Sequence, residues 1–216
     1  MKQNRSFVIL GITGGAGSGK TTVVEMIEQR VPVVFLHCDV IAHELMKPGG
    51  ASYEVLVKEF GKEILEDAGN VISRPKLAKV AMATEATRHR LNELTHPLVR
   101  KAVEEELERL TGAAFRGVVV IEAALLIEAG YKEICDFLWY VHTPLADRIR
   151  RMKEKRGYSE EKIANILAGQ LTEQEFLAQA DVVIENPDRE KNEREELLAK
   201  QIEAHLKECL ESQNEM

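Results

Sequence analysis

The stretch from Gly14 to Thr21 has the residue types and the spacing of a phosphate-binding loop. It reads Gly-Gly-Ala-Gly-Ser-Gly-Lys-Thr, which fits Gly-x-x-x-x-Gly-Lys-[Ser/Thr] between an apolar run and a helical pattern. The glycines let the backbone wrap around an oxyanion with its N–H groups pointing inward, and the positive end of the following helix adds to the attraction. Lys20 would reach the β and γ phosphates of a nucleotide, and the Thr21 hydroxyl would help to hold Mg²⁺.

Nucleotide binding is the prediction that follows from this loop. The alternative is a glycine-rich turn that merely joins a strand to a helix, but the full pattern in this context is uncommon by chance. We expect the phosphates to be bound by Gly15, Ala16, Gly17, Ser18, Gly19, Lys20, Thr21 and Thr22.

Two acidic residues follow predicted strands and could take part in the chemistry. Ligands of open α/β sheets bind outside the carboxyl ends of strands, which is where Asp39 and Glu122 stand. Asp39 could be a general base or a carboxylate associated with Mg²⁺, and the alternative is an N-cap for a helix starting at Val40. Glu122 could support the metal ion indirectly, or it could be a surface carboxylate.

His96 and Arg100 are four residues apart, so they can share one face of a helix. Taken alone, His96 is more typical of a capping or packing residue than of a catalytic one. Arg100 could equally form a salt bridge with Glu104. The spacing therefore leaves the roles of both residues open.

A basic segment lies in the second half of the chain. Its members are Arg148, Arg150, Arg151, Lys153, Lys155 and Arg156. They could form the solvated face of one helix, with cations stabilised near its C-terminus, or a lid whose arginines fold over a triphosphate. A nucleic-acid patch is disfavoured, because Tyr158 is the one aromatic residue beside these cations.

Five apolar runs predict the strands that would position these residues. They are Phe7–Leu10, Val33–Leu36, Val118–Ile121, Phe137–Val141 and Val182–Ile184. Continuous apolar runs of this kind are typical of strands buried on both faces of a parallel sheet. The predicted fold class is therefore α/β, with a five-stranded parallel sheet flanked by helices.

The region from about residue 53 to residue 111 has an almost entirely helical pattern with no strand. Inserted between two strands, it predicts a helical excursion that covers the site, with its last helix beginning at Pro97. Later helix boundaries are marked by Gly157, by Ser159 as a cap, and by Thr172 with Glu175 as a capping box. The segment from Arg189 to about Ser212 is a surface helix to which we assign no chemistry.

Composition restricts the class of protein. The 216 residues carry a formal charge of −7 with a pI near 5.5, which argues against general nucleic-acid binding. No run approaches the ~20 apolar residues of a membrane helix, and the start resembles no secretory signal. The three cysteines are too widely spaced to indicate a disulfide framework or a zinc site, so a reducing cytoplasm fits best.

Several motifs together resemble the dephospho-coenzyme A kinase family over roughly Ile9 to Asn186. They are Gly11–Thr21, Asp39–Ala42 with Pro48–Gly49, Phe60–Gly61 with Ile64–Leu65, His96–Arg100, Leu125–Leu126 with Glu128, Arg151 with Gly157, Gln170, and Ala180–Ile184 with Asn186. The first motif occurs in many kinases. The His-Pro-Leu-x-Arg element and the Ala-Asp-x-Val-Ile-x-Asn ending are much more particular.

The resemblance implies a P-loop kinase core plus two helical parts. The core would comprise residues 1–47, 112–143 and 181–216, with a helical insertion at 48–111 that binds the coenzyme A moiety and a lid at 144–180. The implied reaction is transfer of the ATP γ-phosphate to the ribose 3′-hydroxyl of dephospho-coenzyme A, the last step of coenzyme A synthesis. ATP and Mg²⁺ are the implied cofactors. The expected partner is this small molecule, without nucleic acid or membrane, and the expected state is a monomer or weak homo-oligomer.

The resemblance also implies roles for individual residues. Asp39 matches the carboxylate regarded as the base, and Lys20 and Arg151 would act with it in catalysis. The acceptor would be bound by Asp39, His96, Arg100 and Leu125. Asn186 matches a position near the adenine of ATP.

The chain departs from the family's usual pattern at several positions. His37 and Cys38 stand where Asp-Ala is usual before Asp39, so one carboxylate is missing. His43 replaces an arginine, Ala124–Glu128 replaces Pro-Leu-Leu-Phe-Glu, and Lys155 replaces a second lid arginine and loses its bidentate fork.

Three alternatives remain at the level of sequence. A kinase for another small acceptor would share all of the phosphate-binding features. A GTP-dependent switch protein is disfavoured because the chain lacks Asn-Lys-x-Asp. A binding module with a degenerate site is suggested by the missing carboxylate at His37, and measurable turnover would exclude it.

Overall fold

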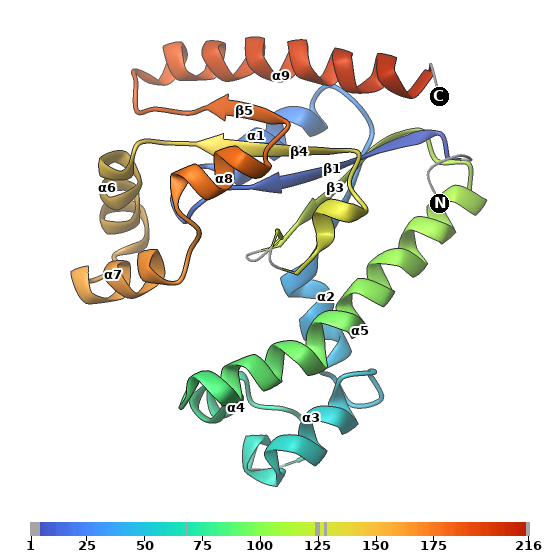
Figure 1. The fold of residues 1–216 in the computed structure, drawn as a ribbon, viewed down its shortest axis with the longest axis vertical. Helices are drawn as coiled ribbons and strands as arrows, with labels where there is room; N and C mark the ends of the chain where they lie inside the picture. Colours follow the sequence, from blue (N-terminus) through green and yellow to red (C-terminus); the bar gives the residue numbers. More distant parts are fainter. Residues whose placement is uncertain (1–4, 68, 124–125, 128, 215–216) are drawn as a thin grey trace. The chain divides into compact units, whose positions relative to one another are not determined.

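The computed structural model describes residues 5–67, 69–123, 126–127 and 129–214 (Figure 1). The chain divides into two compact units. The sheet unit consists of Met1–Phe35 and Ala114–Met216, and the helical unit consists of Leu36–Ala113. The helical unit thus begins inside the second strand, earlier than the expected boundary at residue 48.

A five-stranded parallel sheet organises the sheet unit, as predicted. Its strands are β1 (Phe7–Thr13), β2 (Val33–His37), β3 (Gly117–Glu122), β4 (Phe137–His142) and β5 (Val182–Glu185). They lie in the order β2-β3-β1-β4-β5, which places β1 at the centre. Within this sheet, Phe7 lies opposite Gly117 and Leu10 lies opposite Phe137.

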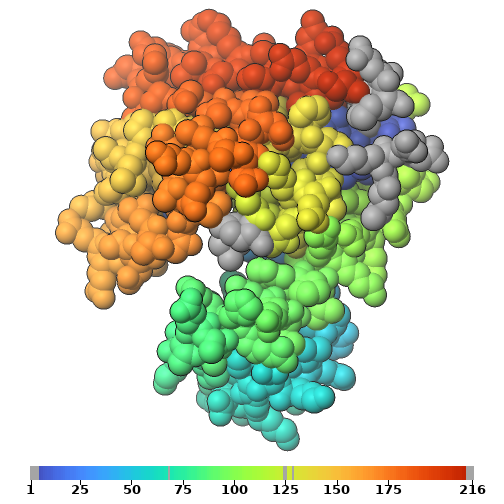
Figure 2. Space-filling view, viewed as in Figure 1, coloured from blue at the N-terminus to red at the C-terminus, as the bar shows by residue number. Residues whose placement is uncertain are grey.

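Two helices cover one face of this sheet. Alternate β1 residues, Val8, Leu10 and Ile12, pack there because successive side chains of a strand point to opposite faces. Apolar side chains of α1 (Lys20–Glu28) and α9 (Lys191–Asn214) complete this core. Figure 1 shows α9 beside β5, and Figure 2 shows its outer side chains at the surface of the sheet unit.

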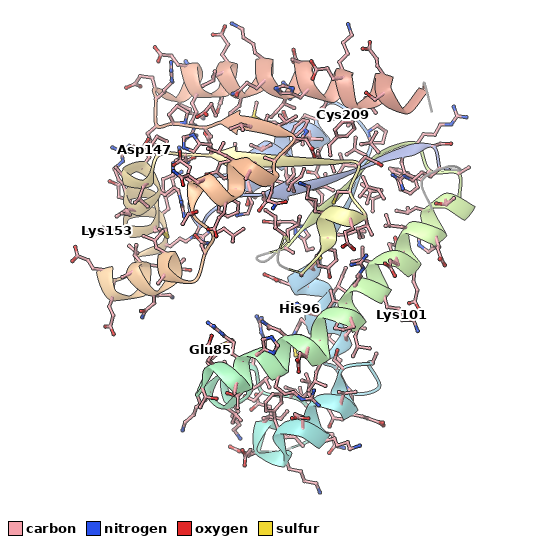
Figure 3. All side chains as sticks on the ribbon, viewed as in Figure 1. Glu85, His96, Lys101, Asp147, Lys153 and Cys209 are labelled. Atoms are coloured by element: carbon pink, nitrogen blue, oxygen red, sulfur yellow. The ribbon has the colours of Figure 1, made fainter. Side chains whose placement is uncertain are left out.

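The inner face of α9 is apolar, although its outer face is charged as predicted. Leu198, Ile202 and Leu206 are buried against the sheet. Cys209, which is labelled in Figure 3, is buried in the same core. Burial raises the pKa of the Cys209 thiol to about 12, so this cysteine is a packing residue and not a reactive thiol.

The other face of the sheet is covered in part by α8 (Glu173–Gln179). The rings of Phe176 and Tyr140 stack with centroids 4.9 Å apart and planes within 8° of each other. The described helices contain none that could span a membrane.

The second predicted strand is present, but the prediction that it is buried was wrong for most of its residues. In β2, Leu36 is buried, but Val33, Val34 and Phe35 are only half-buried and His37 is exposed. The reason is position, because β2 lies at the edge of the sheet, where neighbours cover less of each residue.

Four α-helices make up most of the helical unit. They are α2 (Cys38–Leu45), α3 (Tyr53–Phe60), α4 (Arg74–Ala81) and α5 (Glu85–Gly112). Leu56, Phe60, Ile64, Leu77 and Ala81 form its core. Within the described part of residues 53–111, the structure has no strand beyond one isolated bridge between Leu65 and Ile72, in agreement with the prediction.

The predicted start of the last helix at Pro97 was wrong. Helix α5 starts at Glu85 after the cap Thr84, whose hydroxyl accepts from the Thr87 N–H at 3.1 Å, and Pro97 lies inside the helix. An interior proline removes one backbone hydrogen bond. Here the helix continues through it because Val99, Val103, Leu107 and Leu110 are buried on one side.

The helix boundaries predicted later in the chain are confirmed. Gly157 ends α6 (Leu145–Arg156) with a left-handed φ of 62°. Ser159 caps α7 (Glu160–Ala168), accepting from the Lys162 N–H at 3.2 Å. Thr172 and Glu175 form a capping box at the start of α8.

Candidate active site

The glycine loop between β1 and α1 has a shape that depends on glycine. Gly14, Gly17 and Gly19 have φ angles of 147°, 81° and 91°, which other residues rarely adopt. A Cβ on Gly14 would lie 2.7 Å from the Val141 carbonyl oxygen, and one on Gly19 would lie 2.3 Å from Asn186 Nδ2. Both conformation and space therefore require glycine, as a backbone cradle for phosphate does.

Helix α1 starts with its N–H groups uncapped by any side chain. Its N-cap is Gly19, and its first turn contains no acidic residue. Helices α2, α3, α4 and α6 also start without a side-chain cap, so the preceding glycine loop is what distinguishes α1. An uncapped N-terminus combines unsatisfied N–H groups with the positive end of the helix dipole, which suits an anion.

The cationic and hydroxyl groups expected at the loop are in place. Lys20 is the first residue of α1, and its Nζ donates to the Gly14 carbonyl oxygen at 2.8 Å, across the loop. Thr21 is exposed and Thr22 is half-buried in the next positions. The predicted phosphate-binding residues are thus continuous from the loop into the first turn of α1.

A buried polar network supports the loop from behind. Asn186 Nδ2 donates to the Ser18 carbonyl oxygen at 2.7 Å, and the Thr143 hydroxyl donates to the same oxygen at 2.9 Å. Arg151, only 7% exposed, donates through Nη1 to the carbonyl oxygens of Gly17 and Ser18 at 3.2 and 3.3 Å. The Arg151 guanidinium therefore holds the loop's backbone.

Asp188 is the counter-ion of this network. Its carboxylate accepts from Arg151 Nε at 2.8 Å and also pairs with Arg150. Burial opposes the charge on Asp188, but hydrogen bonds and positive charge from both arginines outweigh it and hold the pKa of this carboxyl below its ordinary value. The Asp188 N–H in turn donates to Asp147 of α6 at 3.0 Å (Figure 3).

Replacing Arg151 by methionine should destabilise the sheet unit. The change removes a buried donor to the Gly17 and Ser18 carbonyl oxygens and deprives Asp188 of its buried partner, so we expect the free energy of unfolding to fall by about 2–3 kcal/mol. Chemical denaturation followed by circular dichroism measures this change. The matched control is Arg150→Met, because Arg150 is exposed on the same helix and should cost far less. Equal stability of Arg151→Met and the unmodified protein would refute this role.

Arg151 and Asn186 thus contact the same loop residues, although their distance in sequence gives no sign of it. Arg151 was expected to meet phosphates and Asn186 to lie near adenine. In the structure, both side chains bond to the main chain of the loop. Their predicted contacts with ATP stay predictions.

Three further side chains contact the loop in ways that the sequence did not predict. Thr143 contacts Ser18, Arg148 donates from Nε to the Ala16 carbonyl oxygen at 3.0 Å, and Gln170 accepts from the Ala16 N–H at 3.2 Å. For Arg148 a signal existed, because it precedes Arg151 by three residues on one helix and so shares its face. Gln170 was named among the family motifs without a role, and Thr143 gave no comparable signal.

Asp39 lies in the helical unit as the second residue of α2. The N-cap position of this helix belongs to His37, so the alternative that Asp39 caps the helix is wrong. Asp39 is exposed, and its carboxylate stands in the first turn, where the helix dipole favours a negative charge. Its predicted role as the base stays a prediction.

His96, which is labelled in Figure 3, lies on α5 in the same unit. Arg100 follows one turn later on that helix. Arg100 Nε donates to Glu104 Oε1 at 3.1 Å, so the salt bridge considered from the sequence is formed. His96 is half-buried, and burial lowers its pKa below the ordinary value of 6.5. The fourth predicted acceptor-binding residue, Leu125, lies outside the described residues.

The lowered pKa of His96 predicts a pH dependence of stability. The unfolded chain binds a proton at His96 more readily than the folded chain does. The contribution of neutral His96 to the free energy of unfolding is therefore fully present above pH 6.5 and is lost as the pH falls below that value. Between about pH 7 and pH 5, the denaturation midpoint should therefore fall more steeply in the unmodified protein than in His96→Gln. Urea titrations at several pH values measure this, and parallel profiles would contradict it.

The arrangement suits a Mg²⁺ ion that is held largely by nucleotide phosphates. Among the described residues there is no group of three or more His, Cys, Asp or Glu side chains that could hold a metal ion by itself. Mg²⁺ keeps several waters and typically uses one or two protein ligands plus substrate phosphates. The exposed Thr21 hydroxyl next to Lys20 fits that pattern.

Comparison with known proteins identifies the family. The model of the dephospho-CoA kinase family matches residues 8–192. The chain belongs to this family. A dephospho-CoA kinase of Geobacter sulfurreducens is 35% identical over 197 residues, covering 90% of this chain and 98% of the relative. The enzyme of Carboxydothermus hydrogenoformans is 32% identical over 190 residues, covering 88% and 91%.

Two solved structures have a fold similar to that of this chain. A crystal structure of a Thermus thermophilus protein has a TM-score of 0.76 at 28% identity, covering 94% of this chain and 99% of that one. A dephospho-CoA kinase from Campylobacter jejuni has a TM-score of 0.58 at 20% identity, covering 93% and 96%. The latter likeness supports the fold alone, which is that of a P-loop kinase.

Proposed function

We propose that this protein transfers the γ-phosphate of ATP to the ribose 3′-hydroxyl of dephospho-coenzyme A, giving coenzyme A and ADP. The observation that carries the proposal is the glycine loop leading into the uncapped start of α1, with Lys20 as the first helical residue. That loop supplies the phosphate chemistry, and membership in the dephospho-CoA kinase family supplies the acceptor.

The loop is proposed to bind the triphosphate and to stabilise the transferred group. The N–H groups of Gly15 to Thr22 would donate to phosphate oxygens, and Lys20 would exchange its bond to Gly14 for the β and γ phosphates. Mg²⁺, held by the Thr21 hydroxyl and the phosphates, would neutralise charge when bound. Positioning and electrostatic stabilisation dominate such reactions, because the transition state is loose.

The helical unit is proposed to bind the acceptor. The basic side chain of Arg100 and the imidazole of His96 would contact dephospho-coenzyme A from α5, with Leu125 as an apolar contact. Asp39 would orient the 3′-hydroxyl and accept its proton as the new P–O bond forms and the bond to the ADP oxygen breaks. Arg151 would contribute through the loop that it holds, and Asn186 would lie near the adenine.

The surroundings of the reaction are proposed at a coarser level. We expect the protein to act in the cytoplasm on small molecules, as a monomer or weak homo-oligomer, without nucleic acid or membrane partners. Its overall charge of −7 supports the absence of nucleic acid.

An acceptor panel tests the proposal. ADP release from Mg-ATP should be measured with dephospho-coenzyme A, AMP, uridine, CMP, dTMP and no acceptor. Turnover with dephospho-coenzyme A alone is expected, and the same assay with GTP should give much less. Turnover with a different acceptor would overturn the proposed substrate, and no turnover with any would favour a degenerate site.

A further inference from the structure

Two side chains outside the loop form hydrogen bonds with the main chain of Ala16. Gln170 Oε1 accepts from the Ala16 N–H at 3.2 Å, while Arg148 Nε donates to the Ala16 carbonyl oxygen at 3.0 Å. The two side chains also bond to each other, with Arg148 Nη2 at 2.8 Å from Gln170 Oε1. One peptide residue of the cradle is thus enclosed by a ring of three hydrogen bonds.

Arg148 lies against the loop through its guanidinium and through its main chain. A Cβ on Gly15 would lie 2.0 Å from Arg148 Nη2, so the guanidinium fills the space that a side chain would need. A Cβ on Gly17 would lie 2.8 Å from the Arg148 carbonyl oxygen. Glycine at both positions therefore allows α6 to approach the loop closely at this residue.

The charges around Arg148 differ from those of its neighbours on α6. Arg150 and Arg151 both pair with the Asp188 carboxylate. The hydrogen bonds of Arg148 go to neutral oxygens, those of Ala16 and Gln170, and burial lowers the pKa of its guanidinium. A half-buried cation bonded to neutral acceptors gains more from an anion than a cation that is already paired.

The Gln170 oxygen also stands at an N–H group of the phosphate cradle. Backbone N–H groups of such loops point at phosphate oxygens when a nucleotide is bound. A hydrogen bond to an ionised acceptor is about twice as strong as one to a neutral amide oxygen. A phosphate oxygen would therefore displace Gln170 from Ala16, and the displacement would free Arg148 Nη2.

From these contacts we infer that Arg148 and Gln170 form a nucleotide-responsive latch on the loop. Without nucleotide, the Gln170 oxygen caps the Ala16 N–H and holds Arg148. When a nucleoside triphosphate binds, a phosphate oxygen takes the place of the Gln170 oxygen, and Arg148 bonds to the phosphate. Arg148 is then a phosphate-binding residue, and Gln170 is a competitor that lowers nucleotide affinity. The inference rests on the proposed nucleotide binding, but not on the identity of the acceptor.

Substitutions of the two latch residues should shift nucleotide affinity in opposite directions. The dissociation constant of Mg-ATP, without acceptor, should be measured by calorimetry for each variant. Arg148→Gln should weaken binding at least about tenfold, the value of a charge-assisted hydrogen bond. Gln170→Ala should tighten it about three- to tenfold, because the competing neutral hydrogen bond is lost. The control Arg156→Gln removes the same charge from an exposed position at the end of α6 and should leave the affinity nearly unchanged.

The test is decisive because the two variants are expected to change the affinity for Mg-ATP in opposite directions. A gain in affinity for Gln170→Ala cannot result from misfolding, whereas a loss comparable to that of Arg148→Gln would show that Gln170 only supports the loop and would overturn the latch. Unchanged affinity for both variants would overturn it as well. Since no acceptor is present, these outcomes leave the proposed transfer to dephospho-coenzyme A untouched, and a failed acceptor panel would leave the latch untouched.

Discussion

Replacing Lys20 by alanine should lower kcat by at least about 10²–10³-fold, the effect of removing one donor that stabilises transition-state charge. Lys20 is the first residue of α1 and already lies across the loop, with its Nζ 2.8 Å from the Gly14 carbonyl oxygen. The ammonium group therefore needs only a local rearrangement to reach a phosphate. Steady-state kinetics with Mg-ATP and dephospho-coenzyme A measure the loss.

The Lys20 experiment needs a check on folding and a matched lysine. The far-ultraviolet circular dichroism spectrum of Lys20→Ala should equal that of the unmodified protein, since the Lys20 bond to Gly14 is one contact in a loop held by several. Lys153→Ala is the control, because Lys153 is exposed on α6 and pairs with Glu160 at 2.6 Å. A folded Lys20→Ala variant with normal kcat would show that the loop does not carry the chemistry.

Replacing Asp39 by asparagine should lower kcat about 10²–10⁴-fold, the range for a general base, while ATP still binds. Asparagine keeps the shape and the hydrogen-bonding oxygen of the side chain but cannot take up a proton. The exposed position of Asp39 in the first turn of α2 makes a large loss of stability unexpected. Kinetics combined with Mg-ATP calorimetry separate the two effects.

A second aspartate in the helical unit is the control for Asp39. Asp67 is exposed and pairs with Lys76, so Asp67→Asn should retain normal kcat. Normal kcat in Asp39→Asn would mean that Asp39 is not the base. A parallel loss of Mg-ATP affinity would instead indicate that its carboxylate helps to hold the metal ion.

The central strands could be predicted from the sequence because burial on both faces leaves continuous apolar runs. This holds for β1, β3 and β4, whose neighbours cover them on each side. It fails for β2 and β5, whose apolar runs lie at the two sheet edges and are only partly buried. Composition alone does not distinguish an edge strand from a central one.

The start of α5 shows how one local signal can mislead. Proline favours the first turn of a helix, so Pro97 indicated a helix start. The actual cap is the pair Thr84 and Thr87, which gives a weaker signal than the usual Thr with Glu. Packing along the later turns of α5 then stabilises a helix that contains the proline.

Spacing alone predicted the part of the candidate site that is continuous in the chain, whereas Gln170 and Asn186 were named only through the family resemblance and their contacts with the loop were not predicted. The residues of the loop are recognised by their spacing, and in the structure the loop glycines have the left-handed φ angles that a phosphate-binding backbone needs. The supports of the loop come from Thr143, Arg148, Arg151, Gln170 and Asn186, which the folding of α6, α7 and β5 brings to it. These side chains contact main-chain atoms of the loop, which every residue type has. The residue types of the loop therefore do not indicate which side chains contact it.

The position of the new phosphate tests the central claim most directly. The protein should be incubated with Mg-ATP and dephospho-coenzyme A, and the product analysed by phosphorus nuclear magnetic resonance and mass spectrometry. We expect one added phosphate on the ribose 3′-hydroxyl, formed in equal amount with ADP, and none with Lys20→Ala over the same time. A phosphate at any other position, or ADP formed without a phosphorylated acceptor, would contradict the account.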